Sequence, residues 1–199
     1  MSQQRLAATD RSVSRASSVA ASAGLGVIAA VVGYLLTYVL AASQVREVVS
    51  DSVPEWIGVA WFYYNAHLVE IETTGEFGGL GGTTTVDFLA ESESTRTVLL
   101  YAVPPLVLVG VGALLAYQLG VTDLGGAVIV GVPVTIGYVL VMTIGAVVAE
   151  TSSEGSFFGI EASGSMSPEL LPAIVLAGLL YPLVFAPVGS VLVTVMRDP

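Results

Sequence analysis

The chain has 199 residues, of which 54% are hydrophobic and only 11% are charged, and its mean hydropathy is +0.85. Soluble domains carry about a quarter of charged residues, so this composition excludes an ordinary soluble protein and indicates a membrane protein. The formal net charge of −10 leaves no basic patch for nucleic acid, and the absence of cysteine excludes disulfides, thiolate metal sites and a cysteine nucleophile.

The charged residues also indicate a source. Lysine is absent, so all 6 basic residues are arginine, against 16 acids. An acidic, lysine-free composition is typical of proteins from salt-loving archaea. Molar salt screens surface charges within about 3 Å, so an acidic surface does not repel itself over long range. We interpret the chain as haloarchaeal, with an ordinary acidic membrane protein as the alternative.

The N-terminal region divides into a polar and an apolar part. Residues 1–18 are polar and arginine-containing, and we expect a flexible cytoplasmic tail. Residues 19–42 are the first apolar block. The small residues Ala41, Ala42 and Ser43 leave a cleaved signal peptide as an alternative, but the apolar part of a signal spans about 7–15 residues and this block is longer. We therefore predict an uncleaved membrane-spanning helix.

Residues 43–96 form a long outer loop, the only connection large enough for structure outside the membrane. Within it, residues 54–68 contain both tryptophans and are predicted to form a helix of about 20 Å, too short to span a hydrocarbon core of about 30 Å. Because Trp and Tyr favour the membrane interface, we predict an interfacial or re-entrant helix, with a fifth span as the alternative. The candidate contact residues are Trp56, Trp61, Tyr63, Tyr64, Asn65 and His67.

The rest of this loop has weaker patterns. Residues 68–73 and 83–89 have strand character, and the glycine-rich residues 75–82 separate them. This arrangement predicts a small extracellular β-hairpin. The glycine run is not a nucleotide phosphate loop, because no Lys-Ser or Lys-Thr pair follows it.

His67 is the single histidine and the obvious candidate for chemistry, with Glu70 and Glu72 close by in sequence. A metal site would need further ligands placed by the fold, so we favour a polar residue that is hydrogen-bonded to the loop. The chain has no HExxH, GxSxG or Ser/Lys pair. We therefore expect no enzyme activity, no catalytic residue, no cofactor and no metal.

Three further apolar blocks are predicted to complete an all-α membrane domain of four transmembrane helices, because none has a charge in its interior and lipid requires internally paired backbone groups. These blocks are residues 97–118, 125–149 and 170–196. Residues 119–124 are too short a connection for anything but an antiparallel hairpin. Residues 150–169 form a second outer loop, in which Ser167, Pro168 and Glu169 have the pattern of a capped start to the last helix.

Arginine sets the expected orientation. With four spans, a cytoplasmic N-terminus places four arginines at cytoplasmic ends and two in the outer loops, and this excess favours both termini inside. The four are Arg5, Arg11, Arg15 and Arg197, and the two are Arg46 and Arg96.

Transport is the main competing function. Coupled transporters place titratable residues inside the membrane, and the helix interiors of this chain have no charged residue. Prolines interrupt the predicted helices, which also occurs where transporters build substrate sites. Uncharged polar side chains are available for a seam, although we favour hydrogen bonds between helices or to their own backbone. They are Tyr34, Thr37, Tyr38, Thr135, Tyr138, Thr143, Ser190 and Thr194.

Five short motifs carry a family resemblance. They are GYLLTY at 33–38, WFYYNAH at 61–67, VDF at 86–88, LYAVPP at 100–105 and LYPLVF at 180–185. In combination they resemble an uncharacterised family of small haloarchaeal multi-pass membrane proteins, over most of the chain. Members are sometimes loosely labelled as transporters. The resemblance implies the source and the topology, and it supplies no functional residue.

An internal duplication is left open by two partial matches. GYLL at residues 33–36 matches GYVL at 137–140, and LLY at 99–101 matches LLY at 179–181. Two copies of a helix–outer loop–helix unit would form a parallel repeat.

The leading hypothesis is a non-enzymatic structural or interaction protein of an archaeal cell membrane. Its outer loop would contact its own bundle or a partner at the cell surface. The alternative is a small transporter or channel subunit that acts as an oligomer. The expected partners are the lipid bilayer and a second copy or another membrane protein, and not nucleic acid.

Overall fold

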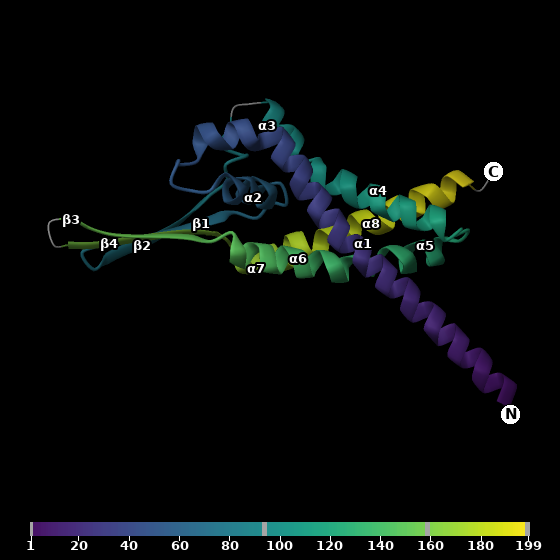
Figure 1. Ribbon diagram of the computed structural model, residues 1–199. Helices are drawn as coiled ribbons and strands as arrows, with labels where there is room; N and C mark the ends of the chain where they lie inside the picture. The colour runs from purple at the N-terminus through teal and green to yellow at the C-terminus, as the bar shows by residue number, and fades with distance from the viewer. Residues whose placement is uncertain (1, 93–94, 158–159, 198–199) are drawn as a thin grey trace.

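A computed structural model describes residues 2–92, 95–157 and 160–197, and within these ranges it describes side chains from residue 19 onward except at 95, 96 and 157. A helical bundle forms one part of the molecule, and a narrow sheet projects from one end of it, roughly along its long axis (Figure 1). The N-terminal end of α1 and the C-terminal end of α8 both lie away from the sheet (Figure 1).

Within the part of the chain that the structure describes, four helical stretches are long and apolar enough to cross a membrane, which confirms the predicted number of candidate spans. They are Val19–Val48, Thr97–Gln118, Leu124–Val148 and Leu170–Arg197. The first belongs to a single helix, and the other three are built from shorter ones. The helices are α1 (Ser2–Val48), α3 (Thr95–Leu100) with α4 (Val103–Gln118), α5 (Leu124–Gly131) with α6 (Val134–Val148), and α7 (Leu170–Pro172) with η1 (Ala173–Leu180) and α8 (Tyr181–Arg197).

The first helix is longer at both ends than predicted. It begins at Ser2, so the backbone of the expected flexible tail continues the helix. Residues 2–18 contain no glycine and no proline, so nothing in this segment breaks a helix. At the other end the helix runs past Ala42, and Val45 is buried beside the next helix.

Prolines divide the later spans, as their positions predicted. Pro104 and Pro105 lie in the first turn of α4, where a missing N–H leaves no bond unmade. Pro133 separates α5 from α6, and Pro172 is followed by the π-helix η1, in which the hydrogen-bond spacing changes. Pro187 lies inside α8. The interruptions are therefore changes within continuous helical stretches.

Glycines let α1 and α6 cross at close range. A Cβ at Gly26 would overlap the carbonyl oxygen of Val134, and a Cβ at Gly137 would overlap the carbonyl oxygen of Ala23. Both helices run toward the sheet, so they are parallel. The contact is reciprocal, because each glycine meets the carbonyl three residues before the other. This is the close approach that small residues permit between membrane helices.

The helices α4 and α8, which both run away from the sheet, make the same kind of contact. Gly112 lies against the carbonyl of Ala186, and Gly189 lies against the carbonyl of Val109. The first contact equates Gly26 with Gly137, whereas the GYLL and GYVL motifs would equate Gly33 with Gly137. The motifs are thus two helical turns out of register with this contact, and the duplication stays a prediction.

Outside the spans, the described residues form four antiparallel strands. The predicted hairpin is present in the first two of them, but a second hairpin pairs with it, so the prediction of an all-α protein was wrong. The strands are β1 (Ile71–Phe77), β2 (Leu80–Val86), β3 (Thr151–Phe157) and β4 (Ile160–Pro168), in the sheet order β2-β1-β4-β3. Gly78 and Gly79, at φ +60° and +81°, form the tight turn between β1 and β2. The glycine-rich segment predicted as a connection is therefore mostly strand.

The last span begins at Leu170, as predicted, but the predicted cap at Ser167 and Pro168 was wrong. Ser167 and Pro168 belong to β4, where they pair with Glu72 and Ile71 of β1. The helix starts at Leu170, with Glu169 as an N-cap that makes no side-chain hydrogen bond. These residues pair with β1 and do not cap the helix, because β4 continues to the edge of the bundle.

The short helix predicted at residues 54–68 is α2 (Glu55–Asn65). Its 11 residues span about 16 Å, and it is not among the candidate membrane spans. Every residue from Ile57 to Asn65 is buried, so α2 packs into the sheet end of the bundle and does not lie on its surface.

Candidate functional site

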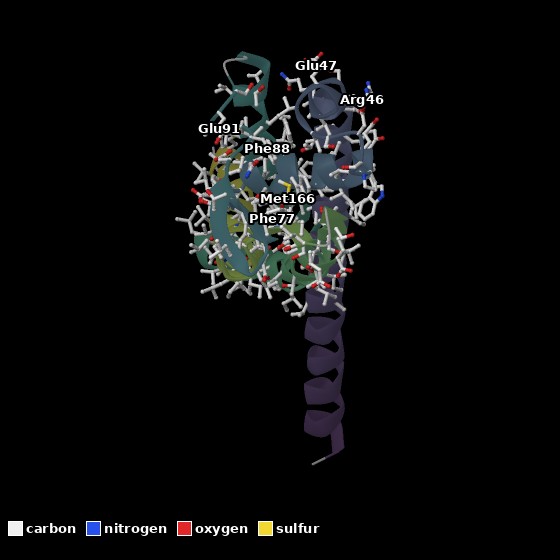
Figure 2. All side chains as sticks on the ribbon, turned by 90° about the vertical axis from the view of Figure 1, so that its left-hand side faces the viewer. Arg46, Glu47, Phe77, Phe88, Glu91 and Met166 are labelled. Carbon is white, nitrogen blue, oxygen red and sulfur yellow. The ribbon has the colours of Figure 1, made fainter. Side chains whose placement is uncertain are left out.

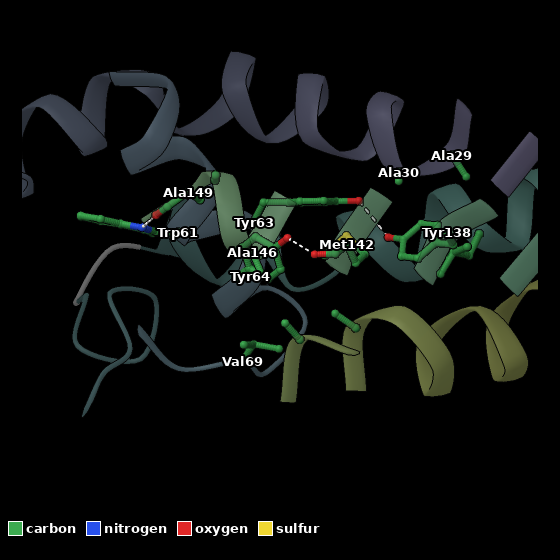
Figure 3. Close-up of a cluster of buried hydrophobic side chains, with 14 of the residues drawn as sticks. Ala29, Ala30, Trp61, Tyr63, Tyr64, Val69, Tyr138, Met142, Ala146 and Ala149 are labelled. Atoms are coloured by element: carbon green, nitrogen blue, oxygen red, sulfur yellow. Dashed lines mark hydrogen bonds between the residues drawn. The ribbon is translucent and has the colours of Figure 1, made fainter. Parts of the chain in front are cut away.

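The candidate contact residues lie on α2 and just after it, and most contact the bundle of this same chain. Five are at most 3% exposed: Trp61, Tyr63, Tyr64, Asn65 and His67. Trp56 is 45% exposed. Figure 3 shows Tyr63 and Tyr64 reaching from α2 toward Tyr138 and Met142 of α6, and Trp61 reaching toward Ala149, which caps α6.

His67 and two tyrosines form a closed ring of hydrogen bonds. His67 Nδ1 lies 2.7 Å from the carbonyl oxygen of Tyr63, and Nε2 lies 2.7 Å from the hydroxyl of Tyr138. The two tyrosine hydroxyls are 2.8 Å apart. A carbonyl only accepts, so in a neutral imidazole Nδ1 donates to it and Nε2 accepts from Tyr138. Tyr63 must then donate to Tyr138, and every group in the ring has a partner.

Burial keeps this histidine neutral. It lowers the pKa of His67 to about 4, although the hydrogen bond from the ring to the Tyr63 backbone acts in the opposite direction. Burial also raises the pKa of the Tyr63 hydroxyl. The neighbouring rings of Tyr63 and Tyr181 lie 4.7 and 4.8 Å from the imidazole, so His67 is surrounded by aromatic groups. With both ring nitrogens occupied, the site has the chemistry of a packed polar contact.

The acids near His67 in sequence are not near it in the site. Glu70 and Glu72 are exposed, whereas His67 is 0% exposed. Among the described residues, no group of three or more His, Cys, Asp or Glu side chains is placed to hold a metal ion.

Two further side chains of α2 bond to the backbone of α6 and of its C-cap residue. The indole nitrogen of Trp61 donates to the carbonyl of Ala149 at 2.8 Å, and the hydroxyl of Tyr64 donates to the carbonyl of Met142 at 2.5 Å. Ala149 caps α6, where the last carbonyls lack partners within the helix. These bonds fix α2 against α6.

Asn65 joins α2 to the base of the sheet. Its side-chain nitrogen donates to the carbonyl of Val69 at 2.8 Å, and its side-chain oxygen accepts from the backbone N–H of Phe88 at 3.0 Å. Val69 precedes β1 and Phe88 follows β2. The Phe88 ring stacks on Trp61 and Phe62, with centroids 6.0 and 5.7 Å away. Bundle and sheet are therefore held together at this point.

Trp56 lies at an exposed edge of α2 beside a charged group. Its carbonyl accepts from the Tyr34 hydroxyl at 3.0 Å. The adjacent Glu55 accepts from Tyr38 at 2.7 Å and from Arg46 at 2.8 Å. These two hydrogen bonds, from Tyr38 first and then Arg46, lower the pKa of Glu55.

Several of the hydroxyls proposed as a polar seam donate to helix backbone, in their own helix or, for one bond of Ser190, in α4. Thr37 donates to the carbonyl of Gly33, Thr194 to that of Ser190, and Ser190 to those of Ala186 and Gly112. These side chains satisfy backbone acceptors, as expected for buried polar groups between helices.

The sheet is a second candidate site, with two different faces. Directly paired residues of neighbouring strands share a face, and the register aligns Glu76 with Ser163 and Ser163 with Glu154. Alternation along the strands adds Glu72 and Glu161 to this face. All four acids of the strands thus lie on one face, which is hollowed along Glu76, Glu154 and Glu161.

The opposite face carries no charge. It presents Phe77 paired with Leu80 and Ala162, and then Ile160 at the tip. Phe77 is 54% and Leu80 83% exposed. Figure 2 looks toward the tip of the sheet, with Phe77 and Met166 near the centre of the view.

Residues 1–197 match a family of unknown function, DUF7978. The chain belongs to this family. No curated protein and no solved structure matches it. The full-length match agrees with the resemblance to an uncharacterised family, and the four candidate spans agree with its multi-pass character.

For this DUF7978 member, sequence reasoning found α2 and its aromatic residues but missed their partners. Tyr138 was assigned only to a polar seam, and the register that separates the two faces of the sheet was not predicted. The second hairpin has one weak signal in retrospect, which is the alternation of serine with acidic or small residues in residues 151–165.

Proposed function

We propose that this protein is a non-enzymatic interaction protein of a haloarchaeal cell membrane, with both termini in the cytoplasm and the sheet outside. In this proposal the helical bundle anchors the molecule, and the sheet binds a partner protein at the cell surface. The observation that carries the proposal is the sheet itself, which projects beyond the bundle and exposes an uncharged face with an apolar tip.

The exposure of this face favours binding. A sheet that only stabilised its own bundle would have one face packed against the bundle, as half-buried sheets do. Here burial is confined to the base, at Ile71 and Pro168, and most other strand residues are exposed or half-buried. Exposed apolar patches on a soluble surface mark interaction sites.

The edge strand β2 offers a second mode of contact. Charged residues, prolines and bulges usually protect an edge strand from further pairing, and β2 has none of them. The two-residue turn makes Phe77 and Leu80 a hydrogen-bonded pair, so the alternation leaves the N–H groups of Thr83 and Thr85 on the open side. A partner strand would extend the sheet there.

The absence of enzyme activity remains part of the proposal. Its support is that the ring nitrogens of His67, the single histidine of the chain, both have partners within the protein. The transporter alternative has less support, because several buried hydroxyls bond to helix backbone.

The test adds charge to one face of the sheet at a time. Phe77→Asp with Leu80→Asp adds two charges to the uncharged face, and the matched control Ser152→Asp with Ser163→Asp adds two to the acidic face. Each protein is expressed in a haloarchaeal host, crosslinked in intact cells and purified, and the yield of crosslinked partner is measured. We expect at least a tenfold loss for the first variant and little change for the control. Equal yields from both variants would contradict the proposal.

A further inference from the structure

An apolar trough of about 250 Å³ opens on the side of the bundle. α1 and α6 form its walls and α2 forms its floor. Ala30 and Tyr34 line it from α1, Tyr63 and Tyr64 from α2, and Met142 from α6. It lies on the sheet side of the glycine crossing between α1 and α6, and it is separate from the exposed face of the sheet.

The trough follows from the way the two helices cross. They touch at Gly26 and Gly137 and then separate toward the sheet, and α2 fills the space between them only in part. Small residues leave the remainder open. At Gly145 a Cβ would lie 2.7 Å from the Tyr64 hydroxyl, so glycine is needed for this aromatic floor to fit.

The tyrosine hydroxyls along the trough do not require a hydrogen-bond partner from an occupant. The three tyrosine hydroxyls along it already have partners: Tyr34 bonds to Trp56, Tyr63 to Tyr138, and Tyr64 to Met142. A water molecule needs two to four polar partners to be held in a protein. The surface offered to an occupant is therefore hydrocarbon and aromatic carbon.

The trough is continuous with the outer surface of two candidate spans. Val31 on α1 and Val148 on α6 line it, and they are 45% and 55% exposed on the outside of the bundle. In a membrane, the medium that meets these side chains is lipid. We propose that one hydrocarbon chain of a membrane lipid inserts into this trough, between Val31 and Val148 and against the half-buried side chains of Tyr34 and Val141.

The dimensions suit part of one chain. From Val141 to Ala149 the trough follows α6 for about 12 Å. At about 30 Å³ per group, the volume of a liquid water, 250 Å³ holds on the order of eight methylenes. The rest of the lipid lies outside, with the interfacial residue Trp56 beside the mouth.

Photolabelling of the full chain tests the site. The protein is reconstituted in vesicles of phosphatidylglycerol that contain a tracer of the same lipid with a diazirine in the middle of one acyl chain. After illumination, labelled residues are identified by mass spectrometry. We expect adducts on Tyr34 or Val141, which line the trough with half-buried side chains.

Filling the trough provides the comparison. Val31→Phe with Val148→Phe places two rings at its mouth, and these adducts should fall at least fivefold. Val39→Phe is the matched control, because Val39 is 81% exposed on α1 and does not line the trough. Adducts confined in the unmodified protein to outward residues such as Val39 and Ile136 would overturn the proposal, as would trough labelling that the filled variant retains. This result is independent of any partner of the sheet.

Discussion

Tyr138 occupies the middle of the ring that joins it to His67 and Tyr63, and the direction of each bond gives the two tyrosines unequal importance. Tyr138→Phe removes both an acceptor and a donor, so the Tyr63 hydroxyl and His67 Nε2 are left buried without partners. We expect a loss of about 2–4 kcal/mol in the free energy of unfolding. Tyr63→Phe removes only a donor to Tyr138, and about 1 kcal/mol is expected.

Thermal unfolding in mild detergent at high salt, followed by tryptophan fluorescence, measures this ranking. Equal losses for the two variants would show that the assigned directions of the hydrogen bonds are wrong.

The depressed pKa of His67 gives the protein a specific dependence on pH. The pKa is about 4 in the folded chain and 6.5 for an unperturbed histidine, so between these values the unfolded chain binds more protons. Stability is therefore full above about pH 6.5 and is lost as the pH falls toward 4, by on the order of 3 kcal/mol. His67→Phe removes this dependence. The measurement is the difference in melting temperature between the two proteins from pH 7.5 to 4, and a difference that stays constant would exclude a neutral buried His67.

At the scale of elements, substitution of two glycines of α4 distinguishes the effect of helix packing on stability from the effect of helix propensity. Gly112 lies against the carbonyl of Ala186, whereas a Cβ at Gly110 would meet nothing within 4 Å. We expect Gly112→Ala to separate α4 from α8 and to cost about 1–3 kcal/mol. Gly110→Ala should be neutral or stabilising by up to about 1 kcal/mol, because alanine favours helices.

Melting temperatures of the two alanine variants, purified side by side, check this prediction. A similar loss for both would mean that α4 and α8 do not approach through Gly112.

The elements also show which features of the fold local sequence patterns predict and which they do not. The spans were predictable because each is a long apolar block, and Pro133 marks a break that a local rule covers. The second hairpin was not, because its serines and glycines have no apolar alternation and its pairing with β1 joins residues more than 80 positions apart. Helix capping at Ser167 failed for the same reason, since β4 is fixed by a distant strand. The burial of His67 likewise depends on Tyr138, which comes from another element.

At the scale of the whole molecule, the bundle and the sheet place distinct surfaces at opposite ends. The hairpin loops and α2 lie at the sheet end, and the connection between α4 and α5 lies at the other (Figure 1). Asn65 and Phe88 connect the two parts by a hydrogen bond and Phe88 stacks on Trp61, so movement of the sheet would displace α2. This polarity makes the orientation in the membrane decisive for function.

Single cysteines report that orientation directly, because the native chain has none. Ser152→Cys lies on β3, and Thr122→Cys lies in the connection between α4 and α5; both positions are exposed. A membrane-impermeant maleimide added to intact cells should label the first variant and should reach the second only after lysis, because the arginine distribution favours cytoplasmic termini. The reverse pattern would place the sheet in the cytoplasm, and the uncharged face would then have to bind an intracellular partner. The lipid site would survive either outcome, because its walls are the spans themselves.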